Sequence, residues 1–236
     1  MSPPATTRSE FLLGMRLFAP IAVSIAAYGV VWGVLAGQAG LSALEVLLMS
    51  GLVYAGASQF VALTLWVPGA PPIGAIVIAV AIINLRMLLM SATLRPLMAN
   101  TPRWRAVPLM FFVSDELWAL TMAQMHKGLG SVPFLFGTGV LAWFAWTGST
   151  LAGRLLGSVI SDPRAYGVDF AFTATFLALL FGMWKGRGDI VPWAVGGLIA
   201  IAMSRLVPGQ WYVIAGGLGG SLAGALAETW RARRVA

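Results

Sequence analysis

Long apolar stretches separated by short polar segments dominate the chain. About 20 consecutive apolar residues cross the roughly 30 Å hydrocarbon core of a bilayer as a helix, and the strand alternation of a transmembrane barrel is absent. The pattern therefore predicts an all-α polytopic membrane protein. Its eight apolar blocks cover residues 17–38, 41–66, 72–94, 106–125, 133–157, 169–184, 192–206 and 211–230.

The Lys and Arg residues between the blocks decide how many of them cross, because cytoplasmic loops carry an excess of Lys and Arg. If all eight blocks cross and the N-terminus is cytoplasmic, the cations divide poorly between the two sides. The inside then holds Arg8, Arg16, Lys127, Lys185, Arg187, Arg231, Arg233 and Arg234, and the outside holds Arg95, Arg103, Arg105, Arg154, Arg164 and Arg205. If the second and sixth blocks instead return to the side they entered from, only Lys127 and Arg205 stay outside.

The same two blocks contain residues typical of a broken helix. The run 55–59, Ala-Gly-Ala-Ser-Gln, interrupts the second block, and the short sixth block opens with Asp169 and continues through Thr173 and Thr175. Non-helical backbone at membrane depth is tolerated where it is buried in protein or lines a cavity. We therefore predict six full spans and two broken or re-entrant elements, with seven or eight full spans as the alternative.

A shift of 116 residues aligns the chain with itself without a gap. The shift superposes Leu-Ala-Gly at 35–37 on Leu-Ala-Gly at 151–153, and Phe60 on Phe176. With three full spans in each half, the halves have opposite orientation, as in many secondary transporters. We predict one transmembrane domain over residues 1–236, with inverted repeats at 17–126 and 133–230. Glycines four residues apart, at 29, 33 and 37 and at 216, 220 and 224, predict close helix packing.

Composition narrows the possible functions. The chain of 236 residues is 59% hydrophobic and 10% charged, with a net charge of +7. Its cations are scattered between apolar blocks, which indicates topology signals and a lipid bilayer as partner and excludes a nucleic-acid-binding face. With no cysteine and one histidine, His126, we expect no metal site and no cofactor. A phosphate-binding loop and a dinucleotide fingerprint are also absent.

Three segments carry a resemblance to a known family. Residues 39–42 read Ala-Gly-Leu-Ser, residues 48–63 read Leu-Met-Ser-Gly-Leu-Val-Tyr-Ala-Gly-Ala-Ser-Gln-Phe-Val-Ala-Leu, and residues 84–92 read Asn-Leu-Arg-Met-Leu-Leu-Met-Ser-Ala. Together with Ser-Asp-Glu at 114–116 and Asp-Phe-Ala at 169–171, they resemble the AzlC family of branched-chain amino acid exporters over nearly the whole chain. In the family pattern a histidine follows the Asn-Leu-Arg triplet, whereas this sequence has Met87.

The resemblance implies a large transport subunit that works with a small membrane subunit of the AzlD type. It also implies export of valine, leucine, isoleucine and sometimes methionine, and a place in the bacterial cytoplasmic membrane. The charge distribution of the six-span arrangement puts both termini in the cytoplasm.

Charged residues inside the apolar blocks are candidates for the transport site. Arg86 lies within the third block, where a charge is costly unless it faces a cavity or finds a partner, so it either snorkels, binds a substrate carboxylate or pairs with an acid. Asp115 and Glu116 lie near the middle of the fourth block. A carboxylate in a low dielectric suits proton coupling, and the alternative is a static ion pair with Arg86.

Polar residues beside the expected breaks complete the candidate site. Ser58 and Gln59 follow the first break, where a helix N-terminus favours a carboxylate, and Asn84 offers both donors and acceptors. Thr173 and Thr175 are the corresponding substrate-binding candidates in the second repeat. Asp169 is an ion-coupling candidate or a helix cap.

These observations predict a proton-coupled secondary exporter of amino acids and not an enzyme. A channel, or an exporter for another small solute, is the first alternative. An intramembrane enzyme acting on a lipid, with Asp115 and Glu116 as acid and base, is the alternative from a different class.

Overall fold

The computed structural model describes residues 6–157, 177, 181, 184, 186–207 and 211–235. The described segments are helices and their connections, with no strand among them, which confirms the all-α prediction. They form two compact units: the first contains Met1–Pro72 and Ile83–Phe172, and the second contains Ile73–Ile82 and Thr173–Ala236. Four of the described helices are long and apolar enough to cross a membrane: Thr7–Gln38, Ile73–Thr93, Val132–Gly157 and Arg187–Leu206.

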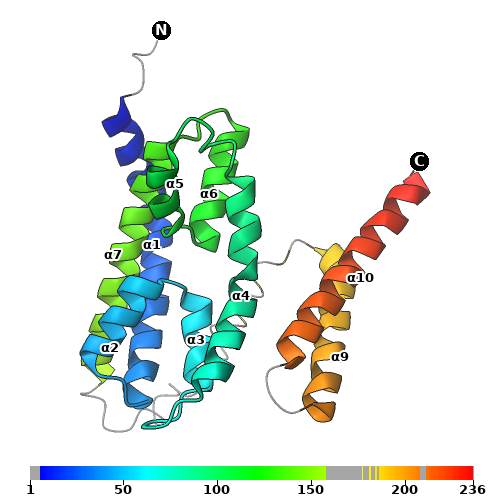
Figure 1. Ribbon diagram of the computed structural model, residues 1–236. Coiled ribbons are helices and arrows are strands. Elements are labelled where there is room, and N and C mark those ends of the chain that lie inside the picture. The colour runs from blue at the N-terminus through cyan, green and yellow to red at the C-terminus, as the bar shows by residue number, and fades with distance from the viewer. Residues whose placement is uncertain are drawn as a thin grey trace. The chain divides into compact units, whose positions relative to one another are not determined.

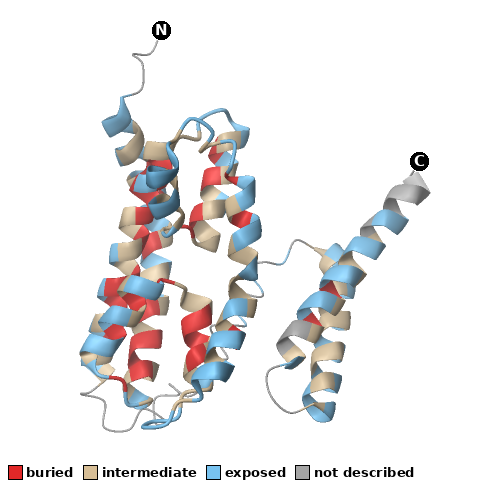
Figure 2. Ribbon diagram, in the orientation of Figure 1, coloured by how far each residue is buried: buried red, intermediate tan, exposed pale blue. Residues whose placement is uncertain are grey.

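Two long helices, α1 (Thr7–Gln38) and α7 (Val132–Gly157), form the core of the first unit. Figure 2 shows the buried residues concentrated along these two helices and α3. Glycines permit the close approach of α1 and α7. A Cβ at Gly33 would overlap the Thr150 carbonyl, and one at Gly153 would overlap the Val30 carbonyl. The spacing of Gly29, Gly33 and Gly37 therefore serves helix packing, as the sequence predicts.

We expect Gly33→Ala to destabilise the protein, because the added methyl group meets backbone of α7 that cannot move without separating the helices. Overpacking of this kind costs about 1–3 kcal/mol. Gly148→Ala is the matched control, since a Cβ there has nothing within 4 Å and alanine is the better helix former. Thermal unfolding of the purified variants in detergent measures the difference. Equal midpoints for the two variants would contradict tight packing at Gly33.

The second apolar block is broken, as predicted. Helix α2 (Ala43–Leu48) continues into a π-helical turn, η1 (Met49–Val53), and α3 (Gly56–Thr64) begins after a sharp bend. At the bend Tyr54 has a left-handed backbone with φ of 46°, which is uncommon for a residue other than glycine and costs about 1–3 kcal/mol. Figure 1 shows that the chain reverses here, so that α2 begins and α3 ends at the same end of the first unit.

The fourth block also folds back, and this corrects the prediction of a single full span there. It forms α5 (Arg103–Met110) and α6 (Asp115–His126), separated by residues 111–114. Part of the physical reason is local. The Ser114 hydroxyl accepts a hydrogen bond from the Leu117 N–H at 3.4 Å and starts a new helix, as an N-cap does. Asp115 and Glu116 therefore occupy the first turn of α6 and not the middle of a span.

The direction of the helices follows from this fold-back. Helices α1 and α7 run parallel, since Gly14 faces Phe134 and Gly37 faces Arg154. The inverted repeat predicts opposite orientation for these two helices, and the structure corrects that expectation because the fourth block does not cross. The sixth block lies largely outside the described residues, whereas the fifth, seventh and eighth blocks are described as α7 and as the helices of the second unit. The complete repeat and the number of six spans therefore remain predictions.

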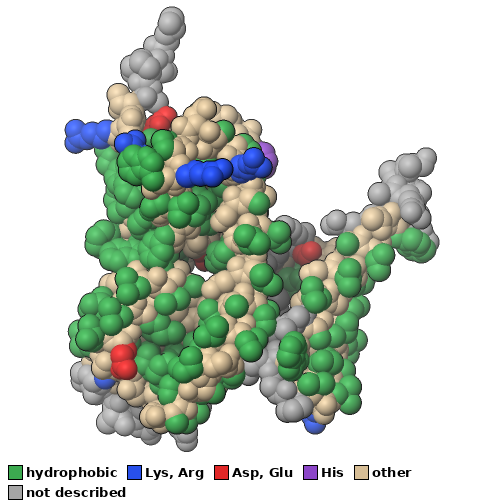
Figure 3. Space-filling model, viewed as in Figure 1, with side chains coloured by type: hydrophobic (Ala, Val, Ile, Leu, Met, Phe, Trp, Pro, Cys, Tyr) green, Lys and Arg blue, Asp and Glu red, His purple; other side chains and the backbone are tan. Residues whose placement is uncertain are grey.

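Most of the cations of the first unit lie at one end (Figures 1 and 3). Helix α1 begins at this end, α4 (Ile73–Thr93) and α6 end there, and α5 and α7 begin there. Arg154 lies at the opposite end, where its Nε donates to the Leu41 carbonyl at 2.6 Å. The sequence predicts Arg95 and Arg154 on one side and Lys127 on the other. The structure corrects this: Lys127 lies at the same end as Arg95, and Arg154 lies at the opposite end. The cation-rich end holds Arg8, Arg16, Arg95, Arg103, Arg105 and Lys127.

The second unit contains a helical hairpin. A short 3-10 turn, η3 (Arg187–Asp189), leads into α9 (Ile190–Leu206), which packs against α10 (Trp211–Val235). Glycines again bring the two backbones close: a Cβ at Gly196 would lie 3.0 Å from the Gly216 carbonyl, and one at Gly220 would lie 2.8 Å from the Pro192 carbonyl. Leu198, Ile201 and other large apolar side chains on these helices are exposed, as suits contact with lipid.

Candidate functional site

The two broken elements of the structure, the second block (α2, η1 and α3) and the folded-back fourth block (α5 and α6), meet inside the first unit. The ring of Tyr54, at the bend between η1 and α3, lies 5.7 Å from the ring of Phe111, at the turn between α5 and α6. Tyr54 is only 8% exposed. The elements enter the unit from opposite ends (Figure 1), so their non-helical backbone meets in the interior, where irregular backbone at membrane depth requires protein or a cavity around it.

An ion pair joins α4 to the start of α6. The guanidinium of Arg86 lies 2.9 Å from the Asp115 carboxylate, and the two side chains are 41% and 44% exposed in the isolated chain. Nearby, the Trp118 indole N–H donates to the Thr93 hydroxyl at 2.8 Å and links the same helices. The sequence allowed Arg86 to snorkel, to bind a substrate carboxylate or to pair with an acid, and this geometry confirms the pair with an acid.

A second polar contact joins α3 to α4. The Ser58 hydroxyl donates to the Asn84 side-chain oxygen at 2.7 Å, and Ser58 is 1% exposed. Asn84 and Arg86 are two residues apart on α4, a spacing at which side chains leave a helix in different directions. The structure thus joins predicted site residues from three separate blocks through two contacts to α4, Ser58 with Asn84 and Asp115 with Arg86, and Glu116 follows Asp115 in the first turn of α6.

The N-terminus of α3 supplies further donors. Ala55 precedes the helix and provides no side-chain cap, and the first backbone bond of the helix runs from the Gln59 N–H to the Ala55 carbonyl. The N–H groups in the first turn of α3 therefore have no side-chain cap. The dipole of the helix favours a negative group there. This is the arrangement that the sequence predicts for a substrate carboxylate.

Gln59 is placed differently from the other candidates. Its side chain is fully buried, with its oxygen accepting from the Trp146 indole N–H at 2.9 Å and its nitrogen donating to the Ser50 hydroxyl at 3.2 Å. Trp143 adds a bond from its indole N–H to the Gly51 carbonyl at 3.0 Å. These contacts fasten the broken element to α7. Binding of substrate by Gln59 stays a prediction.

Sequence reasoning missed Tyr28. This residue lies on α1, and its hydroxyl is within electrostatic reach of Glu116, Arg86 and Asp115. A tyrosine inside an apolar span was the available signal, because a buried phenol hydroxyl needs a polar partner. Three other candidates, Asp169, Thr173 and Thr175, lie outside the described residues, so their roles remain predictions.

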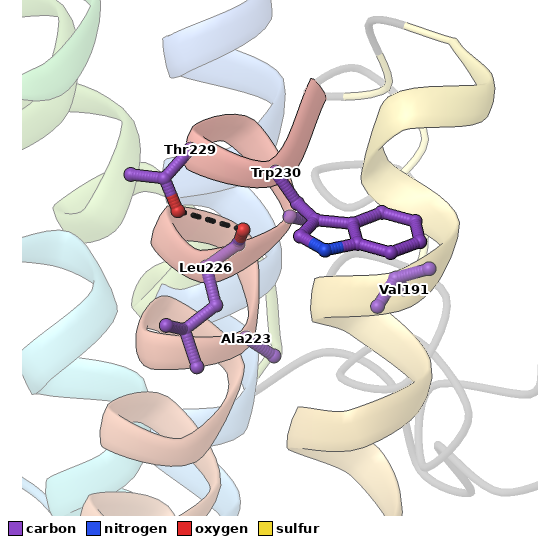
Figure 4. Close-up of a pocket in the computed structure, with 6 residues that line it drawn as sticks. Val191, Ala223, Leu226, Thr229 and Trp230 are labelled. Carbon is purple, nitrogen blue, oxygen red and sulfur yellow. Dashed lines mark hydrogen bonds between the residues drawn. The ribbon is translucent and has the colours of Figure 1, made fainter. Parts of the chain in front are cut away.

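The second unit has a pocket whose lining is mostly apolar, unlike the charged site of the first unit (Figure 4). It encloses about 460 Å³ between α9 and α10, lined by Val191, Ala223, Leu226, Ala227, Thr229 and Trp230. Its lining is apolar apart from Thr229 and Trp230, and the Thr229 hydroxyl donates to the Leu226 carbonyl at 2.8 Å. The lining residues carry no charged side chain with which to hold a zwitterion. Within the described ranges, no three His, Asp or Glu residues gather as metal ligands either.

Three known membrane proteins are similar to this chain over most of its length. An uncharacterised membrane protein of Archaeoglobus fulgidus is 32% identical over 215 residues, which cover 90% of this chain and 93% of the relative. The branched-chain amino acid transport protein AzlC of Bacillus subtilis is 23% identical, over 88% of this chain and 82% of the relative. The inner membrane protein YgaZ of Escherichia coli is 24% identical, over 85% and 84%.

No solved structure gives a significant match. The apolar helices and the membrane-protein relatives show that the chain is embedded in a membrane. The model of the AzlC protein family matches residues 20–160, a range that contains both broken elements and the Arg86–Asp115 pair, and the chain therefore belongs to the AzlC family.

Proposed function

We propose that this protein is a secondary exporter of branched-chain amino acids that works with a small AzlD-type membrane subunit. The observation that carries the proposal is the cluster of opposite charges and uncapped helix N–H groups where the two broken elements meet. A zwitterion needs both signs of charge within a few ångströms. The printed name of the Bacillus subtilis relative, a branched-chain amino acid transport protein, supports the substrate class.

In this proposal the substrate carboxylate binds at the N-terminus of α3, with Ser58, Asn84 and Arg86 around it. A carboxylate there satisfies free N–H groups and meets a favourable dipole. Thr173 and Thr175 are proposed to complete the site from the second repeat.

Coupling is proposed to use protons, with Asp115 or Glu116 as the carrier and Asp169 as a further candidate. Asp115 is held by Arg86, and a carboxylate at this site binds either a proton or the substrate ammonium group, so that uptake of a proton accompanies release of the substrate. Movement of the broken elements against the long helices would then expose the site to each side in turn. Nothing in this scheme requires a covalent step, so we propose a transporter and not an enzyme.

The cation-rich end of the first unit is proposed to face the cytoplasm, in a bacterial cytoplasmic membrane. Six cations at that end against Arg154 at the other match the positive-inside rule. This places the N-terminus in the cytoplasm. The C-terminus, with Arg231, Arg233 and Arg234, is proposed to lie on the same side, where these cations meet anionic lipid.

Efflux from preloaded cells tests the function. We expect cells that lack their own exporter to release radiolabelled leucine and valine several-fold faster when they express this chain together with an AzlD-type subunit. The chain alone, and the subunit alone, are the matched controls. Saturation of the flux and competition by isoleucine distinguish a carrier from a channel. Unchanged efflux from cells with confirmed membrane insertion of both chains would contradict the proposal.

A further inference from the structure

The hydroxyl of Tyr28 is buried without a hydrogen-bond partner among the described residues. The Nε atom of Arg86, the cation of the ion pair with Asp115, is also buried without a hydrogen-bond partner among the described residues. Nearly all buried polar side-chain atoms in proteins are paired, so an unpaired one calls for an explanation. Two such atoms beside the same carboxylates indicate a place that a polar ligand fills.

Packing holds the Tyr28 ring in this place. Its centroid lies 4.7 Å from that of Phe60 on α3 and 5.9 Å from that of Trp146 on α7. The next residue, Gly29, lets α1 approach Ser149 of α7 so closely that a Cβ would collide. The backbone and ring are therefore fixed on three sides, and the hydroxyl cannot swing away to find another partner.

The charges around the hydroxyl do not cancel. Glu116 and Asp115 each contribute a negative charge, and Arg86 contributes one positive charge. Arg86 is paired with Asp115 at 2.9 Å, whereas Glu116 has no hydrogen-bond or ion-pair partner in the part of the chain that the structure describes. One net negative charge remains beside an unused phenol oxygen, which is the environment that a cation prefers.

We propose that Tyr28 and Glu116 form the subsite for the ammonium group of the amino acid. An ammonium group has three donors: the Glu116 carboxylate accepts one and neutralises the charge, and the Tyr28 oxygen accepts a second. The inference rests on the proposed function, which it deepens by separating the two ends of the substrate. The carboxylate end stays at the N-terminus of α3.

The test compares ligands that carry one or both charged groups. Tyr28→Phe removes the hydroxyl and keeps the ring, and Tyr212→Phe on α10 is the matched control. Competition against radiolabelled leucine on the full-length chain, reconstituted in lipid nanodiscs with its small subunit, gives the affinities of three compounds. They are leucine, leucine methyl ester, which keeps the ammonium group, and 2-hydroxy-4-methylpentanoate, which keeps only the carboxylate.

We expect Tyr28→Phe to weaken leucine and the methyl ester about tenfold, as loss of a hydrogen bond to a charged group does, and to leave the hydroxy acid unchanged. The unfolding midpoint of the empty protein should not fall, since the hydroxyl has no partner to lose. Equal losses for all three ligands, or no loss for leucine, would overturn the ammonium subsite alone. A wild-type chain that binds neither leucine nor its ester would overturn the proposed function as well.

Discussion

Replacement of Arg86 by Gln is expected to lower leucine efflux about thirtyfold. The change removes the guanidinium that lies 2.9 Å from Asp115 and leaves two adjacent carboxylates, Asp115 and Glu116, beside the site without a compensating cation. Truncating one member of a buried, hydrogen-bonded charge pair typically costs 2–5 kcal/mol, about 30-fold to several thousandfold in an equilibrium or rate constant. The lower end applies to this pair, whose side chains are 41% and 44% exposed. The measurement is initial efflux from preloaded cells, normalised to the amount of protein in the membrane.

Arg205→Gln is the matched control, because it removes a cation from an exposed position in the last turn of α9. Its efflux should stay close to that of the wild type. A loss of efflux as large as that of Arg86→Gln would show that net charge, and not the pair with Asp115, governs transport.

The exchanged pair, Arg86→Asp with Asp115→Arg, separates a structural role from a transport role. If the pair only joins α4 to α6, the exchange restores it, and both stability and efflux recover. If Asp115 carries a proton or Arg86 meets the substrate, stability recovers and efflux does not. We expect the second result, because the moved carboxylate no longer starts α6 beside Glu116.

Replacement of Gln59 by Leu should have the largest effect on stability. Leucine has a similar volume, but it leaves the Trp146 indole N–H and the Ser50 hydroxyl without partners in a buried position. Each unpaired group costs about 1–3 kcal/mol, so we expect the two to cost about 2–6 kcal/mol together. Thermal unfolding in detergent, with the folded fraction followed by size-exclusion chromatography, measures it.

The double variant Gln59→Leu with Trp146→Phe provides the control. It removes both partners of the 2.9 Å hydrogen bond, and replacing both partners by apolar groups of similar shape is often nearly neutral. Stability should therefore recover in large part. A double variant as unstable as the sum of the single ones would contradict the structural role. Recovered stability without recovered efflux would support the prediction that Gln59 also contacts substrate.

The charge balance at the site offers a physical route to coupling. Tyr28, Glu116, Asp115 and Arg86 enclose one surplus negative charge, and either a substrate ammonium group or a proton neutralises it. Because both compete for the same carboxylate, occupancy by one disfavours the other, which is the condition for exchange of amino acid against protons. The scheme extends the proposed function and is tested by the pH dependence of efflux in the Glu116→Gln variant.

Local signals in the sequence were sufficient for several features of the fold. The apolar blocks predicted the long helices, and Ile73–Thr93 and Val132–Gly157 match their blocks within one residue. The Ala-Gly-Ala-Ser-Gln run predicted the break that the structure places at Tyr54 and Ala55. These features depend on hydropathy and on backbone preference over a few residues, so neighbours in sequence are enough to specify them. The resemblance also identified the family.

Tertiary structure decided the features that depend on distant segments. The apolar character of residues 106–125 fits a span and a folded-back pair equally well. The choice follows from packing: Phe112, in the turn between α5 and α6, contacts Phe136, and Trp118 of α6 bonds to Thr93. The pairing of Arg86 with Asp115, of Ser58 with Asn84 and of Gln59 with Trp146 joins residues 26 to 87 positions apart. Hydropathy in a sequence reports which residues avoid water, but a side chain finds its polar partner only after the helices have met.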